Sequence, residues 1–502
     1  MKLTTTDPRT GTTREIDIDV STDQEVIAAA SAAHRAFADL RARPRSWRVG
    51  LLRALADALE DAAPALAETA MRETGLPRPR LEGEVARSVF QFRLFADAVE
   101  EGGYLEAIID HAGTTPLGPQ PDVRRMLVPI GPVAVFGASN FPFAFSVIGG
   151  DTASAIAGGN PVVIKAHGSH PLTSRISFQT LARAAEDYGA PAGSLGIVYG
   201  QAAGAALVAD PRIAAVGFTG SLATGRILQD IIAGRETPIP FFGELSSLNP
   251  LVVTAAAVRE RGAAIAQGLF ASFTGSAGQL CTKPGIAFIP ADADALVDEL
   301  AELARAAAPQ TLLNARIHAS FDEIRRRLID EGRARSVVAP VAAGEGFGVS
   351  PALLEIDAAD MTAAVTEEAF GPLLVVARYR TLEEVREALR VIPHSLTMTI
   401  HSEPEDAAAV GALVDAVQDV VGRLVFDGYP TGVRVSWAMH HGGPWPATNT
   451  QHTSVGVTAL RRFLRPLAWQ DAPPALLPDE LHDGPVPIPR RVDGVLQLAA
   501  SV

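Results

Sequence analysis

The residue best suited to chemistry in this chain is its single cysteine, Cys281, which lies in a run of small residues from Thr274 to Gly285. A cysteine acts as a nucleophile in its thiolate form, and a nearby cation or helix N-terminus lowers the thiol pKa enough to supply one. Lys283 adds positive potential, and the glycines of the run let the backbone approach a substrate closely. The alternative is that Cys281 is a small buried hydrophobic residue. The prediction of a nucleophile therefore depends on partners elsewhere in the chain.

Two polar residues fit the roles of those partners. Asn140 follows a predicted strand, and its amide can donate, together with the backbone N–H of Cys281, to the oxygen of a tetrahedral adduct. Taken alone, Asn140 is equally typical of an Asx turn before Pro142. Glu244 closes another predicted strand and can take a proton from water if partial burial raises its pKa. Taken alone, a glutamate at this position is more often a solvated or ion-paired carboxylate.

A third segment has the residue types of a phosphate site. Gly217–Ser221 joins a predicted strand to a predicted helix, so Ser221 can cap that helix while the helix N–H groups receive a pyrophosphate. Gly220 precedes the cap, and Gly225 lies in the first turns of the helix. The chain has no G-x-G-x-x-G at this loop, so the loop alone is a weak signal.

A fourth segment, Glu367–Pro372, pairs a carboxylate with an aromatic ring. The Glu368 carboxylate can accept from both hydroxyls of a ribose, and the Phe370 ring can pack beside a nicotinamide. Taken alone, the segment is an ordinary turn.

Composition excludes several classes of protein. The 502 residues hold 43 basic and 57 acidic side chains, and the net charge of −14 argues against nucleic acid and anionic membranes as partners. One cysteine cannot form an internal disulfide, so we expect a cytoplasmic protein. The N-terminus lacks the apolar run of a signal peptide, and the uncharged run 126–150 is broken by prolines and is predicted as strand, loop and helix. The eleven histidines show no metal-ligand spacing, so no metal is assigned.

Alternating strands and helices predict the fold class, α/β. One alternation has strands at 133–136, 161–165, 195–199, 214–218 and 239–242, with helices near 144–158, 171–188, 201–209 and 221–234. A second has strands at 251–253, 286–289, 373–379 and 396–400, with helices at 257–273 and 381–391. Each predicts a parallel sheet covered on both faces, with ligands at the strand C-termini.

The two ends of the chain follow other patterns. Residues 13–20 alternate as a half-buried strand does, and three helices follow between Thr22 and Gly103, broken near Pro44 and Pro77. The proline-rich tail from about Leu467 is expected to wrap a neighbouring surface without regular structure.

The segments around Asn140, Ser221, Glu244, Cys281 and Glu368, in this order, resemble the aldehyde dehydrogenase superfamily from about residue 10 to 470. Further segments resemble its 2,5-dioxovalerate (α-ketoglutaric semialdehyde) dehydrogenase branch, which is close to NADP-dependent fatty-aldehyde dehydrogenases. These segments are 137–142, 149–155, 165–167, 428–433, 441–448 and 461–466.

The resemblance implies two doubly wound α/β domains and an oligomerisation segment. Residues 1–244 would carry the N-terminal helices and a Rossmann-like NAD(P) domain, residues 245–435 the catalytic domain, and residues 436–502 the C-terminal return and tail. A homodimer or homotetramer is expected from the relatives.

The resemblance also implies a role for each matched residue. Cys281 would be the nucleophile, Asn140 the oxyanion donor and Glu244 the base that activates the deacylating water. The cofactor would contact Lys165 at the adenosine ribose, Ser221 at the pyrophosphate, Glu368 at the nicotinamide ribose and Phe370 at the nicotinamide.

Two departures from the family pattern bear on the cofactor and the base. The usual E-L-G-G-K segment is Glu244–Leu248 with two serines here, which changes the backbone behind the carboxylate. Many NAD-specific members have a Glu three residues after the ribose lysine, where this chain has Gly168. Without that carboxylate a 2′-phosphate is not repelled, and Lys165, His167 or His170 could attract it. The sequence thus favours NADP, with NAD as an alternative.

The expected reaction is oxidation of 2,5-dioxovalerate to 2-oxoglutarate through a thiohemiacetal and a thioester. Such a substrate needs a cation at the pocket mouth, for which Lys283, Arg434 and Arg462 are candidates. A long-chain aldehyde would instead need an apolar funnel, for which the candidates are Phe141, Phe143, Phe145, Trp437 and Trp445. A CoA-acylating enzyme and a non-catalytic nucleotide-binding protein are the remaining alternatives.

Overall fold

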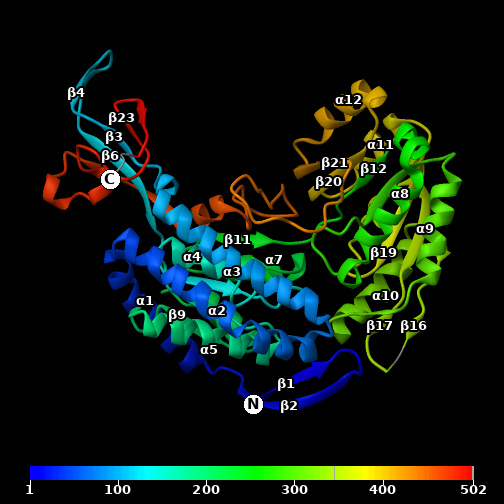
Figure 1. The fold of residues 1–502 in the computed structure, drawn as a ribbon, viewed down its shortest axis with the longest axis horizontal. Coiled ribbons are helices and arrows are strands. Elements are labelled where there is room, and N and C mark those ends of the chain that lie inside the picture. Colours follow the sequence, from blue (N-terminus) through cyan, green and yellow to red (C-terminus); the bar gives the residue numbers. More distant parts are fainter. Residues whose placement is uncertain (344, 500–502) are drawn as a thin grey trace.

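The computed structural model describes residues 1–343 and 345–499 (Figure 1). The chain opens with a hairpin and three long helices: β1 (Lys2–Asp7), β2 (Thr12–Asp19), α1 (Asp23–Ala42), α2 (Arg45–Thr74) and α3 (Arg78–Glu101). Pro44 precedes α2, and Gly75 ends it in the left-handed conformation that a residue without a side chain adopts at low cost. The predicted breaks between the three helices are confirmed.

The first sheet contains five parallel strands in the order β11-β10-β7-β8-β9. These are β7 (Val133–Phe136), β8 (Val162–Lys165), β9 (Leu195–Val198), β10 (Ala215–Thr219) and β11 (Phe241–Glu244). The connecting helices are α4 (Gly150–Ala157), α5 (Pro171–Asp187), α6 (Gln201–Ala209) and α7 (Leu222–Ala233). The strand order reverses between β7 and β10, and ligands of such sheets bind outside the strand C-termini at that point. The predicted parallel sheet is confirmed.

The second sheet has seven strands in the order β15-β18-β19-β13-β12-β20-β21, parallel except for β15. The strands are β12 (Leu251–Val253), β13 (Ile286–Pro290), β15 (Arg335–Val338), β18 (Ala352–Asp357), β19 (Leu373–Tyr379), β20 (Ser395–His401) and β21 (Val421–Phe426). The helices are α8 (Ala255–Thr274), α9 (Asp294–Ala306), α10 (Ala315–Asp330), α11 (Leu382–Leu389) and α12 (Ala407–Val417). A small sheet of β14 (Gln310–Thr311), β16 (Ala342–Ala343) and β17 (Gly348–Val349) lies beside them.

A third sheet joins the two ends of the chain in the order β22-β6-β3-β23-β24. It contains β3 (Ile108–Asp110), β6 (Val123–Pro129), β22 (Leu464–Gln470), β23 (Arg490–Val492) and β24 (Val495–Gln497), next to the hairpin of β4 (Gly113–Thr115) and β5 (Gly118–Gln120). The expectation of a tail without regular structure is wrong, because β22 pairs with β6 from Leu464 to Gln470. Only the proline-rich stretch between β22 and β23 lacks strands, since prolines cannot donate to a ladder.

Figure 1 shows the first and second sheets as neighbouring units, with β11 running from the first towards the second. The residues that follow β11 lead directly into β12, so Glu244 lies where the chain leaves one sheet for the other. Within the described residues, every helix is too short or too polar to cross a bilayer.

Candidate active site

Three side chains from distant parts of the chain meet at one point. The Nε2 atom of His441 lies 3.0 Å from Oε1 of Glu244 and 3.4 Å from Sγ of Cys281. The three groups lie within 4.8 Å of one another. Glu244 and His441 are buried, whereas Cys281 is half-buried. A thiol, an imidazole and a carboxylate at these distances can pass a proton among themselves.

Glu244 is held at the end of β11 by contacts with both neighbouring segments. The Ser454 hydroxyl donates to Oε2 of Glu244 at 2.5 Å, and the backbone N–H of Gly220 donates to the Glu244 carbonyl at 3.0 Å. The backbone of Glu244 also forms a bridge with Thr448. The carboxylate is thus fixed between the β10–α7 turn and the loop that carries His441.

His441 is oriented by its own loop, because its backbone N–H donates to the Thr453 hydroxyl at 2.7 Å. Sequence reasoning missed this histidine, since it tested the pair His440–His441 only for metal spacing. One available signal was that His441 begins the branch-like segment 441–448. A thiol, an imidazole and a carboxylate are also a donor set that zinc accepts.

Cys281 sits in a tight turn that follows α8. Ser276, Ala277 and Gly278 adopt φ values of 53°, 56° and 67°, and a side chain at Gly278 would lie 2.2 Å from the Gly371 carbonyl oxygen. Gly278 therefore lets this turn pack against the segment that carries Glu368. The sequence prediction gave the glycines here a role in substrate approach, whereas at Gly278 the close approach is between two protein segments.

Asn249 fixes the other side of the turn, because its amide donates to the carbonyls of Cys281 at 2.8 Å and Lys283 at 3.0 Å. Asn140 reaches the same turn, since its amide donates to the Gln279 carbonyl at 2.9 Å. Arg80 donates to the Asn140 carbonyl at 3.0 Å. Asn140, which follows β7, is thus brought beside the cysteine turn.

The charges around the sulfur differ from the sequence expectation of an activated thiolate. Burial raises the pKa of the Cys281 thiol well above its usual value, the negative charge of Glu244 raises it further, and Arg87 opposes them. Burial would also raise the pKa of Glu244, but the positive charge and hydrogen bond of His441 leave that pKa below its ordinary value. Burial was expected to make Glu244 a weaker acid, and its contacts with His441 and Ser454 reverse that effect.

Lys283 does not face a substrate, because its amine is 2% exposed and donates to the carbonyls of Ala369 at 3.0 Å and Leu373 at 2.9 Å. Those carbonyls flank the segment of Glu368 and the half-buried Phe370. The Glu368 carboxylate accepts from the backbone N–H of Ser247 at 3.1 Å, and burial raises its pKa. This contact comes from the backbone of residue 247, whereas the Ser247 hydroxyl donates to Asn249.

The other two candidates to bind a substrate carboxylate, Arg434 and Arg462, differ in whether their charge is free to do so. Arg462 is buried and donates to Asp151 at 2.6 Å, so its charge is already compensated. Arg434 is exposed. Lys283 and Arg462 are therefore unsuited to bind a substrate carboxylate.

The predicted cofactor residues lie at the C-terminal ends of β8 and β10. Lys165 ends β8, is half-buried and has its pKa lowered by burial. Ser221 caps α7, since its hydroxyl accepts from the N–H of Thr224 at 3.3 Å, as predicted. A side chain at Gly225 would lie 2.5 Å from Leu245, and one at Gly220 would lie 2.6 Å from Phe218.

These residues fit a dinucleotide. The first turn of a helix has N–H groups without intrahelical partners, and α7 begins at the sheet edge that also carries Lys165. Gly168 is exposed, and a side chain there would meet nothing within 4 Å. Burial holds the pKa of His167 well below its usual value, so its ring is neutral at pH 7. His170 is buried and lies 2.9 Å from the Ala138 carbonyl, so it is unsuited to attract a phosphate.

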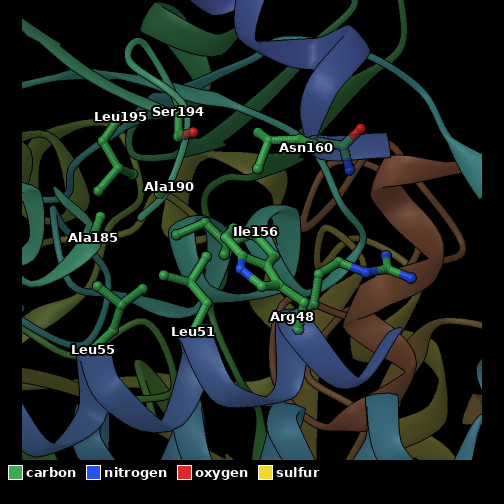
Figure 2. Close-up of a pocket in the computed structure, with 11 residues that line it drawn as sticks. Arg48, Leu51, Leu55, Ile156, Asn160, Ala185, Ala190, Ser194 and Leu195 are labelled. Atoms are coloured by element: carbon green, nitrogen blue, oxygen red, sulfur yellow. The ribbon is translucent and has the colours of Figure 1, made fainter. Parts of the chain in front are cut away.

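A small cavity lies apart from these residues (Figure 2). It is lined by Arg48, Leu51, Ile156, Asn160 and neighbouring side chains and has a volume of about 10 Å³. That volume holds about one water molecule. The cavity contains none of the predicted site residues and is too small for a substrate.

Known proteins include relatives that match nearly the whole chain. The model of the "Aldehyde dehydrogenase family" matches residues 2–418. The chain is 42% identical to the α-ketoglutaric semialdehyde dehydrogenase 2 of Azospirillum brasilense, over 95% of this chain and 92% of that protein. It is 40% identical to the α-ketoglutaric semialdehyde dehydrogenase of Acinetobacter baylyi, with the same coverage.

Among solved structures, proline utilization A of Bradyrhizobium japonicum (mutant D779W) superposes with a TM-score of 0.77 at 27% identity. That match covers 90% of this chain and 45% of the larger protein, so this chain spans about half its length.

Proposed function

This chain belongs to the aldehyde dehydrogenase family and is an aldehyde-oxidising oxidoreductase, and we propose that it oxidises 2,5-dioxovalerate to 2-oxoglutarate with NADP. The observation that carries the proposal is the meeting of Cys281, His441 and Glu244 at one point. The two relatives named for this semialdehyde, at 42% and 40% identity over nearly the whole chain, support the choice of substrate.

The first step is addition of the Cys281 sulfur to the aldehyde carbon. Because burial and the Glu244 charge disfavour a resting thiolate, the thiol must lose its proton as the carbon–sulfur bond forms. The Nε2 atom of a neutral His441, 3.4 Å from the sulfur, is placed to take that proton. The Asn140 amide and the backbone N–H of Cys281 stabilise the oxyanion.

The second step returns the carbonyl and leaves a thioester on Cys281. NADP, when bound, accepts the hydride that leaves the substrate carbon. Glu244, whose lowered pKa keeps it ionised at pH 7, then takes a proton from water that attacks the thioester. Once His441 holds the thiol proton, its ion pair with Glu244 limits the basicity of that carboxylate.

We assign cofactor contacts to the edge of the first sheet and to the Glu368 segment. Lys165, with Gly168 and the neutral His167 beside it, binds the adenosine ribose, and Ser221 with Gly220 and Gly225 forms the pyrophosphate turn. Glu368 and Phe370 bind the nicotinamide ribose and ring. The exposed Gly168 leaves room for a 2′-phosphate, which favours NADP over NAD.

The three predicted divisions of the chain have corresponding roles. Residues 1–244 bind the cofactor, residues 245–435 carry the nucleophile, and residues 436–502 return to the cofactor side, where His441 completes the site. We propose a cytoplasmic homodimer or homotetramer. The edge strand β24, with exposed Val495 and Leu496, supports pairing between subunits.

The test is a set of assays of the purified chain with 2,5-dioxovalerate and with a long-chain aldehyde, each with NADP and with NAD. We expect the highest kcat/KM for 2,5-dioxovalerate with NADP, and 2-oxoglutarate as the product. A preference for the long-chain aldehyde would contradict the proposed substrate. Consumption of added CoA would contradict the proposal that water hydrolyses the thioester.

A further inference from the structure

Arg87 lies beside the site, and unlike Arg80 on the same helix it has guanidinium donors without hydrogen-bond partners among the described residues. It lies on α3 and is half-buried. Its Nε and Nη2 atoms are buried, and neither has a hydrogen-bond partner within residues 1–343 and 345–499. Two turns earlier on the same helix, Arg80 donates to Glu84, Ser276 and the Asn140 carbonyl. Guanidinium donors withdrawn from water without acceptors are costly, so those of Arg87 call for an anion.

The guanidinium of Arg87 lies beside two phenyl rings near the site. Its central carbon lies 5.2 Å from the Phe145 ring centre and 5.9 Å from that of Phe141. The Phe145 ring lies 6.1 Å from the ring of His441, which contacts Cys281. One phenyl ring therefore separates the Arg87 charge from the reacting groups.

Electrostatics agree with this placement. Burial lowers the pKa of Arg87, and the nearby acidic groups Glu84, Cys281 and Glu244 oppose that effect. Glu84 itself is occupied by Arg80 and by the backbone N–H groups of Phe143 and Ala144. No carboxylate of the described residues forms an ion pair with Arg87, and an arginine remains charged at pH 7.

The proposed substrate carries a carboxylate at the end remote from its aldehyde. In 2,5-dioxovalerate four C–C bonds of about 1.5 Å separate the aldehyde and carboxylate carbons, so an extended molecule spans roughly 5 Å. A carboxylate can accept two parallel hydrogen bonds from a guanidinium fork. A long alkyl chain would leave the same donors without acceptors.

A second arginine near the sulfur is less suited to this role. Arg423 on β21 already donates to the Pro430 carbonyl at 2.7 Å and contacts the Met439 sulfur at 3.8 Å. Arg423 therefore supports the loop that leads to His441.

We propose that Arg87 is the specificity-determining residue of this enzyme and binds the substrate carboxylate remote from the aldehyde. This assignment rests on the function proposed above. It makes Phe141 and Phe145 the platform on which the guanidinium lies, rather than walls of a funnel for a long-chain aldehyde.

The test compares the parent with Arg87→Met and Arg87→Lys on two aldehydes of equal chain length, 2,5-dioxovalerate and uncharged pentanal. For Arg87→Met we expect kcat/KM for 2,5-dioxovalerate to fall about 100-fold, mainly through KM, because a charge-assisted bidentate contact is lost. We expect a change of less than about 3-fold for pentanal, and partial recovery in Arg87→Lys. Arg93→Met removes an exposed arginine from the same helix and serves as the matched control.

Results that differ from these expectations distinguish an error about Arg87 from an error about the substrate. An equal fall for both aldehydes, with a shifted pH profile of Cys281 alkylation, would make Arg87 a residue that acts on the thiol. An unchanged preference for 2,5-dioxovalerate over pentanal in Arg87→Met would refute the role of Arg87 and leave the proposed substrate unaffected. A parent that does not prefer 2,5-dioxovalerate over pentanal would refute the proposed substrate instead.

A measurement on the parent keeps the assignment testable if Arg87→Met fails to fold. The methyl ester of 2,5-dioxovalerate lacks the negative charge and adds one methyl group, so we expect the parent to use it about 100-fold less efficiently than the acid. Arg87→Lys should narrow that ratio. Equal use of ester and acid by the parent would overturn the assignment.

Discussion

The Nε2 atom of His441 lies 3.4 Å from Sγ of Cys281, although 160 residues separate them in the chain. The same atom lies 3.0 Å from Oε1 of Glu244. One imidazole nitrogen therefore contacts both the proposed nucleophile of the first step and the proposed base of the second.

Replacing His441 by alanine should slow the chemical step. Without the imidazole the thiol loses its nearest proton acceptor, so we expect kcat to fall about 100-fold, within the range for a general base. The measurement is steady-state kcat together with the rate of the NADPH burst. His440→Ala is the control, since that neighbour has no contact with the sulfur. Equal kcat values for the two variants would contradict the role of His441.

Replacing Glu244 by glutamine should lower the pKa of Cys281. Burial is the largest cause of the raised thiol pKa, and the Glu244 charge is the next, so removing that charge makes the thiolate less costly. The midpoint of iodoacetamide alkylation should move to lower pH, and one thiol per chain makes the signal unambiguous. Glu367→Gln removes an exposed carboxylate and should leave the midpoint unchanged.

The same Glu244→Gln protein should form the thioester and then stall. We expect a burst of NADPH near one equivalent per site, followed by turnover at least about 100-fold slower than in the parent, because deacylation lacks its base. Rapid-mixing absorbance at the nicotinamide band measures both phases. Turnover at the parental rate would show that another group activates the water.

Replacing Gly168 by glutamate should shift the cofactor preference towards NAD. The position is exposed and a side chain there has room, so the fold should tolerate the change. A carboxylate would repel the 2′-phosphate of NADP and accept from ribose hydroxyls of NAD. We expect the ratio of kcat/KM for NADP to that for NAD to fall about 10-fold or more, corresponding to about 1.4 kcal/mol. Gly168→Gln, which adds size without charge, should move the ratio far less.

Replacing Lys283 by methionine should loosen the Glu368 segment. The buried amine donates to the Ala369 and Leu373 carbonyls, and leaving two such acceptors unsatisfied costs about 2 kcal/mol or more. We expect a lower Tm and a higher KM for the cofactor, with a smaller effect on the aldehyde KM. A Tm equal to that of the parent would refute the structural role. Lys2→Met, which removes a surface amine, is the control.

The sequence by itself determined the strands of the first sheet and indicated Cys281 as the candidate nucleophile. Apolar runs with the period of buried strands predicted the strands of the first sheet to within two residues, because burial on both faces leaves few alternatives to Val, Ile and Phe. The ordered segments around Asn140, Ser221, Glu244 and Cys281 were sufficient to indicate the family. These features are local, so neighbouring residues specify them.

The strands of the tail could not be predicted from local sequence patterns. Prolines between 473 and 489 suggested a segment without regular structure, yet β22 before it and β23 after it pair with β6 and β3. Strand pairing depends on a partner more than 300 residues away, and composition contains no information about that partner.

Only the tertiary structure decided the charges of the site. Folding brings His441 between Glu244 and Cys281, so the Glu244 pKa falls where burial alone predicted a rise. It also turns Lys283 towards the Glu368 segment, pairs Arg462 with Asp151, and leaves Arg87 beside Phe145. A pKa or an ion pair is a sum over all groups within a few ångströms, and which groups those are depends on how remote segments pack.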